Sequence, residues 1–107
     1  MRYKKVTAIF RIDLLDKVEK SLQQLGVHGL SVSKVKGYGE YADFYAKDWM
    51  TNHARIELFS DEKGAEIAAR TIMDAASLGM EGDGIVAILP VDKLYRIRTK
   101  AEVDEED

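Results

Sequence analysis

The segment SDEKGAEIAARTIMDAASLGMEGDGIVAILPV, from Ser60 to Val91, contains a helix signal, a glycine-rich turn and a strand signal in succession. Ser60 and Asp61 are residue types that cap the first turn of a helix. The apolar residues that follow recur at helical spacing on one side: Ala65, Ala68, Ile72, Met73 and Ala76. Gly79 predicts the end of this helix. The apolar run GIVAILPV, residues 84–91, predicts a strand after the turn.

The first part of the chain shows a similar order of signals. The run KKVTAIFRI, residues 4–12, is rich in β-branched and aromatic residues and predicts a strand. A helical pattern follows from Asp13, a candidate N-cap, to Gly26, a candidate stop. The alternating segment GLSVSKVKG, residues 29–37, predicts a second strand. The apolar residues behind these two predictions are Leu14, Leu15, Val18, Leu22 and Leu25 in the helix, and Leu30, Val32 and Val35 in the strand.

Two more strands complete the predicted fold. HARIELF, residues 53–59, has its apolar side chains on one face, and KLYRIR, residues 93–98, predicts a short extra strand near the C-terminus. The order of elements is therefore βαββαβ with a short C-terminal extra strand. Two helices on one face of a four-stranded antiparallel sheet form the ferredoxin-like α+β fold. We expect a single domain of this kind over residues 1–107.

The composition limits the classes of function. The chain has 107 residues, 46% of them hydrophobic, and a net charge of −3, which indicates a globular domain with no general attraction to nucleic acid. The absence of cysteine excludes disulfides and thiol chemistry, and it agrees with a cytoplasmic protein. No apolar run reaches the length of a membrane span, so no direct membrane insertion is expected. The acidic segment 100–107 predicts a disordered tail.

Two short motifs are suited to binding an anion. Gly82 and Gly84 flank Asp83, and glycines at these positions allow a positive φ and a row of backbone amides that surrounds an anion. The alternative is an ordinary turn between a helix and a strand. Arg96 and Arg98 stand at alternate positions, so on a strand they would share one side and could hold a phosphate between them. Their alternative is a solvated face paired with carboxylates.

The stretch from Gly37 to Asn52 has no clear periodicity and predicts a long loop that begins with Gly37 and Gly39. Aromatic residues are crowded into it, and they indicate either a surface for a partner protein or packing against a neighbouring subunit: Tyr41, Phe44, Tyr45 and Trp49. His28 and His53 have no histidine or cysteine nearby in sequence, which favours structural roles over metal binding. No catalytic motif is present, so we expect no enzymatic activity and no cofactor.

Taken together, these motifs resemble the PII signalling protein family. GLSVSKVKGYG is similar to that family's second strand and the start of its long T-loop, and ARIEL is similar to the strand that follows the loop. GMEGDGIVAILPVDKLYRIRT is similar to the family's nucleotide loop and C-terminal signature. The resemblance covers the chain from its first predicted strand to Thr99.

The resemblance implies a homotrimer that binds an adenine nucleotide in three clefts between subunits and regulates a membrane transporter or an enzyme through its T-loop. Carried over by position, Gly82, Asp83 and Gly84 would lie along the phosphates and ribose. Arg96 and Arg98 would reach the phosphates from the neighbouring subunit. The remaining nucleotide-binding positions would be Gly37 and Gly39 at the base of the T-loop and Ser31 near the adenine.

Several residues depart from the family pattern. Ile85 and His53 stand where the family has lysines, and Glu40 and Tyr41 stand where it has arginine and glutamine. Fewer positive charges favour AMP or ADP over ATP as the effector. The T-loop is also shortened, which indicates a divergent PII-like branch. The alternative function is a metal-responsive or scaffolding trimer linked to heavy-metal efflux, for which His28, His53 and Met50 would be the residues to test.

Overall fold

The computed structural model describes residues 2–27, 29–37 and 51–103. Over these ranges the elements follow one another as β1 (Tyr3–Arg11), the 3-10 helix η1 (Ile12–Leu14), α1 (Leu15–Gln24), β2 (Leu30–Gly37), β3 (Thr51–Asp61), α2 (Glu62–Ala76), β4 (Gly84–Pro90), β5 (Tyr95–Arg96) and β6 (Ala101–Glu102). The predicted succession of strands and helices is confirmed.

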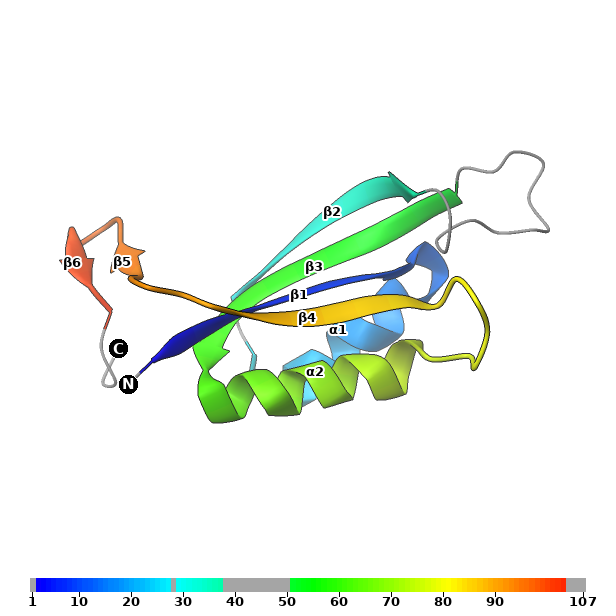
Figure 1. Cartoon of the computed structure of the whole chain (residues 1–107), viewed down its shortest axis with the longest axis horizontal. Coiled ribbons are helices and arrows are strands. Elements are labelled where there is room, and N and C mark those ends of the chain that lie inside the picture. Colours follow the sequence, from blue (N-terminus) through cyan, green and yellow to red (C-terminus); the bar gives the residue numbers. More distant parts are fainter. Residues whose placement is uncertain (1, 28, 38–50, 104–107) are drawn as a thin grey trace.

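The four long strands form one antiparallel sheet in the order β2-β3-β1-β4. Both helices lie on the same side of this sheet, as Figure 1 shows, and they pack against each other as well as against the strands. Strands β5 and β6 form a separate two-stranded hairpin at one end of the molecule (Figure 1). This arrangement is the ferredoxin-like α+β fold predicted from the sequence, with the expected extra strand paired to a second one.

The core lies between the sheet and the helices and follows from alternation along the strands. In β1, Val6, Ala8 and Phe10 are buried while their neighbours are partly exposed. The strand register places these three opposite Leu58, Ile56 and Ala54 of β3, all of them buried. The helices contribute the rest of the buried cluster: Val18, Leu22, Ala65, Ala68, Ile72, Ala75 and Ala76.

The helix ends were predicted with mixed success. Asp61 caps α2, because its carboxylate accepts a hydrogen bond from the backbone amide of Gly64 at 2.6 Å. Gly26 ends α1 with φ of 88°, and the bonds from Gly26 N to Gln23 O and from Val27 N to Leu22 O form a Schellman motif. The prediction for Asp13 is wrong, since it lies inside η1 and no side chain caps α1.

Two apolar residues that were assigned to buried faces are exposed. Met73 is 46% exposed, because α2 turns it toward the free edge of β4 and not into the core. Val32 is 42% exposed, because β2 is the edge strand and extends past the cover that the helices provide. In addition, α2 ends at Ala76, three residues before the glycine that was expected to end it.

Three boundaries also differ from the prediction. Strand β3 is longer than expected at both ends, and its first residue, Thr51, pairs with Gly37 of β2. Residues 37, 51 and 52 therefore belong to the sheet, and the rest of the expected loop, residues 38–50, lies outside the described residues. At the other end of the chain, residues 101–102 form β6, so the acidic segment is not a disordered tail from residue 100 onward.

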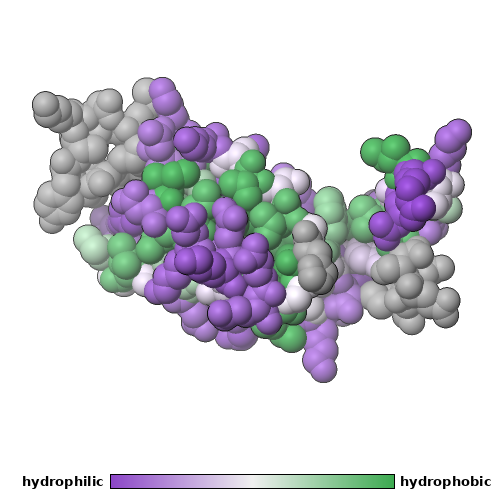
Figure 2. Space-filling view, turned by 180° about the vertical axis from the view of Figure 1, so that it is seen from behind, coloured by the Kyte–Doolittle hydropathy of each residue, from purple (hydrophilic) through white to green (hydrophobic). Residues whose placement is uncertain are grey.

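The sheet face that the helices leave open carries apolar side chains of β3 and β4. Ile85 is 46% exposed, Leu89 42% and Phe59 49%. An ion pair of 2.8 Å between Lys5 Nζ and a carboxylate oxygen of Glu57 lies among them. Ile97, beside the β5–β6 hairpin, is 92% exposed. Figure 2 shows hydrophobic surface on this hairpin, which projects from the body of the molecule.

Gly84 is the position where the fold most clearly needs a glycine. Its φ is 115°, and a Cβ there would overlap the carbonyl oxygen of Ile9 on β1. We therefore expect Gly84→Ala to lower the free energy of unfolding by about 3 kcal/mol. The measurement is urea denaturation at fixed protein concentration. The matched control is Gly29→Ala, where a Cβ meets nothing within 4 Å. Equal stabilities for the two variants would contradict this account.

Candidate functional site

One end of the sheet brings together two of the motifs that the sequence singled out. Gly84 at the start of β4 pairs with Phe10, next to Arg11 at the end of β1. Arg11 pairs with His53, near the start of β3. At the same end, Gly37 is the last residue of β2. The base of the predicted loop and the Gly82–Gly84 turn therefore lie at the same end of the sheet, on the right in Figure 1, with β3 and β1 between them.

The turn after α2 is folded around the carboxylate of Asp83. Oδ2 of Asp83 accepts hydrogen bonds from the backbone amides of Leu78, Gly79 and Met80, at 2.9, 2.9 and 3.1 Å. The Asp83 amide in turn donates to the carbonyl of Met80 at 3.2 Å. The anion held by these three amides is thus the protein's own side chain. The carboxylate of Asp83 is hydrogen-bonded inside the turn, so only the backbone of Asp83 is placed to lie along a ligand as the sequence predicts.

Arg11 is the residue at this site that sequence reasoning missed. Its Nη2 donates a hydrogen bond of 2.7 Å to the carbonyl of Glu81, and its Nε lies 3.5 Å from Oδ1 of Asp83. About 70 residues separate the partners in sequence, and an arginine that ends a strand carries no local signal of such a contact. Only the pairing of β1 with β4 brings them together.

The electrostatics of the turn favour the ionised form of Asp83. Burial by itself raises the pKa of this carboxyl group. The amide hydrogen bonds from Leu78, Met80 and Gly79 and the contact with Arg11 outweigh that effect, so the pKa of Asp83 is lower than its ordinary value. The turn therefore holds a permanent negative charge at neutral pH.

The glycines on either side of Asp83 adopt conformations that other residues disfavour. Gly82 has φ of 88° and Gly84 has φ of 115°. These values confirm that the turn depends on glycine. They allow the backbone to approach a ligand closely at the place where the side chain of Asp83 points inward.

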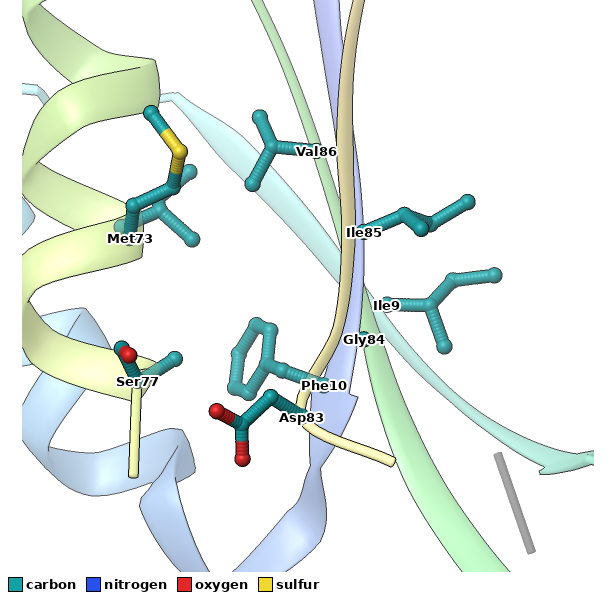
Figure 3. A pocket seen from close by; sticks show the side chains of 10 residues that line it. Ile9, Phe10, Met73, Ser77, Asp83, Gly84, Ile85 and Val86 are labelled. Carbon is teal, nitrogen blue, oxygen red and sulfur yellow. The ribbon is translucent and has the colours of Figure 1, made fainter. Parts of the chain in front are cut away.

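A cavity of about 220 Å³ adjoins the turn between α2 and β4. Figure 3 shows Met73, Ser77 and Val86 around it, with Phe10 and Asp83 at its lower end. Ile9 and Ile85 project on the other side of β4 (Figure 3). The walls are thus mostly apolar, with one carboxylate, and are suited to a small apolar group.

Arg96 and Arg98 lie far from the turn in the same chain. Arg96 belongs to β5, which follows the end of β4. At that end of β4, Val91 N donates a hydrogen bond to the carbonyl of Tyr3, the first residue of β1. At the other end of β4, Gly84 pairs with Phe10 of β1. Phe10 is seven residues after Tyr3, so about 23 Å of extended strand separates the two ends. Figure 1 shows the β5–β6 hairpin at the opposite end of the molecule from the turn.

The expected side-by-side placement of the two arginines on a strand is wrong. Arg96 pairs with Ala101 in the hairpin, whereas Arg98 lies in the turn of residues 97–100 that joins its strands. The chain bends there because β5 is only two residues long. Both arginines are exposed.

Other predicted residues are placed as follows. Ser31 is exposed near the start of the edge strand β2, where it pairs with Glu57 of β3. His53 is only 1% exposed. The remaining positions, Gly39, Tyr41, Phe44, Tyr45 and Trp49 of the loop together with His28, Glu40 and Met50, lie outside the described residues. Within residues 2–27, 29–37 and 51–103, no three histidine, aspartate or glutamate side chains gather in a way that could hold a metal ion.

The family model for the nitrogen regulatory protein P-II matches residues 3–101 of this chain, from β1 into β6. The chain belongs to the P-II family. A P-II protein of Cereibacter sphaeroides is 36% identical over 104 residues, covering 90% of this chain and 92% of the relative. The P-II protein of Azospirillum brasilense is 32% identical over the same shares of the two chains.

The fold of a solved P-II structure agrees with the present one. Arabidopsis thaliana PII bound to citrate superposes with a TM-score of 0.82 at 29% identity, covering 99% of this chain and 92% of the other. Membership of this family of regulatory signalling proteins confirms the resemblance noted in the sequence. No helix in the described part of the chain is long and apolar enough to cross a membrane.

The P-II turn should respond to acid through Asp83. Its folded-state pKa lies below its unfolded value, so its ionised form stabilises the fold above about pH 4, and this contribution disappears as the pH falls through the folded-state pKa. We expect Asp83→Asn to lower the free energy of unfolding by about 1–3 kcal/mol at pH 7, because the charge-assisted bonds are lost.

The difference between the native protein and Asp83→Asn should shrink as the pH falls below the unfolded-state value of about 4 and through the lowered folded-state pKa of Asp83, because protonation removes the charge that the variant already lacks. Urea denaturation at several pH values and one protein concentration measures it. A difference that stays constant from pH 7 to pH 3 would show that ionised Asp83 does not hold the turn.

Proposed function

We propose that this P-II protein is a trimeric signalling subunit that binds ADP or AMP in clefts between subunits and regulates a transporter or an enzyme through the loop of residues 38–50. One observation carries the proposal: the glycine turn and the arginines lie at opposite ends of a single chain. One phosphate group can contact both only where the turn of one subunit meets the hairpin of another.

The exposed apolar surface supports an assembly of this kind. On the open sheet face, the side chains of Ile85, Leu89 and Phe59 are each more than 40% exposed. Ile97 projects from the hairpin. Complete burial of an exposed side chain of this kind contributes about 1.5–3 kcal/mol, and the three half-exposed residues on the sheet face would each contribute a part of that. We propose that a second copy covers them in an orientation that also brings its hairpin to the turn, so that one contact buries the apolar surface and completes the anion site.

The chemistry at the two ends supports a small anionic ligand. The turn offers backbone that can be approached closely, and Arg96 and Arg98 are exposed guanidinium groups on a short hairpin. The Arabidopsis relative is described as bound to citrate, which is a small polyanion. We infer that the present chain likewise takes a polyanion, and the resemblance to PII proteins favours an adenine nucleotide.

The residues near the turn support an effector with few phosphates. Ile85, directly after the turn, presents a half-exposed apolar side chain where the family pattern has a lysine. His53 is enclosed at the strand ends and is only 1% exposed, so its ring is not presented to a ligand at the surface. Neither residue offers a positive charge to a third phosphate, so the balance favours ADP or AMP.

The metal-responsive alternative has less support. His53 is buried within the sheet, and the described residues hold no cluster of potential ligands. The two other residues named for that function, His28 and Met50, lie outside the described residues. No observation in the described part of the chain therefore favours metal sensing over nucleotide binding.

Replacing both arginines should remove the phosphate contacts without affecting the fold. We expect Arg96→Ala combined with Arg98→Ala to weaken ADP binding by more than tenfold, or about 1.4 kcal/mol, in isothermal titration calorimetry. Arg70→Ala, an exposed arginine on α2, is the matched control and should leave the affinity unchanged. Light scattering should give three times the monomer mass for all these proteins. Unchanged ADP affinity in the double variant would refute the site.

The preference among nucleotides provides a separate test. In the same calorimetric experiment we expect ADP or AMP to bind at least as tightly as ATP with magnesium, because Ile85 supplies no charge for a further phosphate. Ile85→Lys should restore part of that charge and shift the preference toward ATP. Much tighter binding of magnesium-ATP by the native protein would contradict the proposed effector.

A further inference from the structure

The contact between Arg11 and the glycine turn spans the whole chain but has no role in the function proposed so far. Arg11 is the last residue of β1, which pairs with β3 on one side and β4 on the other. Like β3, β1 is an inner strand hydrogen-bonded along both edges, and it is therefore a firmer anchor than an edge strand. The turn, in contrast, connects two elements through seven residues that belong to no helix or strand, 77–83.

The guanidinium group of Arg11 contacts this turn at two points. Nη2 donates to the carbonyl of Glu81 at 2.7 Å, and Nε lies 3.5 Å from Oδ1 of Asp83. The planar guanidinium presents its donors in a fixed fork, so two contacts fix both the distance and the orientation of the turn. The side chain of Arg11 is 20% exposed and that of Asp83 22%, so water screens the pair only partly.

The two carboxylate oxygens of Asp83 contact different parts of the protein. Oδ2 gathers the amides of Leu78, Gly79 and Met80, which sets the internal shape of the turn. Oδ1 faces Arg11, which sets where that shape sits relative to the sheet. Without Arg11 the turn would lose its link to the end of β1, and its internal bonds to Oδ2 would open more often because nothing on the sheet would then hold the Asp83 carboxylate in place.

We propose that Arg11 is a positioning residue for the nucleotide site: it fixes the Gly82–Gly84 turn on the end of β1 before any ligand arrives, and it strengthens ADP binding without touching ADP. The inference rests on the proposed function, since it concerns the same site. A turn that is already ordered loses less conformational entropy when a ligand binds, and this gain appears as affinity.

The geometry distinguishes positioning from a general effect of charge. Lysine at position 11 would keep the positive charge but would offer one ammonium group in place of two separate nitrogens, so it could not reproduce both the hydrogen bond to Glu81 and the ion pair with Asp83. If Arg11 acted only as a charge that attracts anions, lysine would replace it fully. If it positions the turn, lysine should replace it only in part.

The experiment compares Arg11→Gln, Arg11→Lys and the control Arg70→Gln. The first readout is amide hydrogen exchange, by NMR, at Leu78, Gly79 and Met80 in the nucleotide-free protein. We expect exchange to be at least about tenfold faster in Arg11→Gln, intermediate in Arg11→Lys and unchanged in Arg70→Gln. This readout needs no ligand, so it tests Arg11 even if the protein binds no nucleotide.

The second readout is the ADP affinity of the same variants. Arg11→Gln should weaken ADP binding at least about fivefold, with Arg11→Lys again intermediate. Native exchange rates in Arg11→Gln would overturn the proposal, as would fast exchange combined with native affinity. If Arg11→Gln does not fold, Arg11→Lys becomes the variant that tests the proposal. Native values for both readouts in that variant would then refute positioning by the fork.

If the native protein bound no ADP at all, the proposed function would fail, and the proposed strengthening of ADP binding would fail with it. The exchange data would still decide whether Arg11 orders the turn. The double variant of Arg96 and Arg98 should differ from Arg11→Gln in one readout: both bind ADP weakly, but the double variant keeps native exchange at the turn. The two proposals can therefore fail separately.

Discussion

The carboxylate of Asp83 is the group on which the glycine turn at one end of this molecule depends. It accepts hydrogen bonds from the amides of Leu78, Gly79 and Met80, which follow the end of α2. Arg11 then connects the folded turn to the central strand of the sheet. Gly84 can enter β4 against the carbonyl of Ile9 only because it has no side chain. The turn is thus an internally complete structure, and what it offers a ligand is a backbone surface rather than an acidic side chain.

In the proposed function, the same geometry explains why a single chain would not form the nucleotide site by itself. Strand β4 carries the chain from the turn to the other end of the sheet, and the arginines follow only after Pro90. Exposed apolar residues on the open sheet face and at the hairpin give each chain a reason to associate with others. Association and ligand binding would therefore depend on the same surfaces, as the proposed trimer requires. Membership of the P-II family agrees with this arrangement of turn, hairpin and sheet.

Features set by local chemistry could be predicted from the sequence. The alternation of Val6, Ala8 and Phe10 predicted a strand with one buried face, and Asp61 was identified as a cap. Features set by distant parts of the chain could not. The contact of Arg11 with Glu81 depends on strand pairing, and the exposure of Val32 depends on which strand lies at the edge. The side-by-side placement of Arg96 and Arg98 failed because the hairpin bends after two residues, which the alternating sequence does not reveal.

The central claim is that each binding site is built from two chains, and mixing two defective proteins tests it directly. One protein carries Ile85→Glu, which places a negative charge beside the turn, and the other carries Arg96→Ala with Arg98→Ala. Neither should bind ADP alone. Because Ile85 also belongs to the apolar surface that association would bury, light scattering must first show that each protein and the refolded mixture form trimers. After the two are unfolded and refolded together in equal amounts, about a quarter of the clefts should join a native turn to native arginines, because each cleft draws its two sides from different subunits. Calorimetry should then show ADP binding at native affinity with about that fraction of sites. If mixed trimers form and still bind no ADP, the turn and the arginines do not share a site between chains.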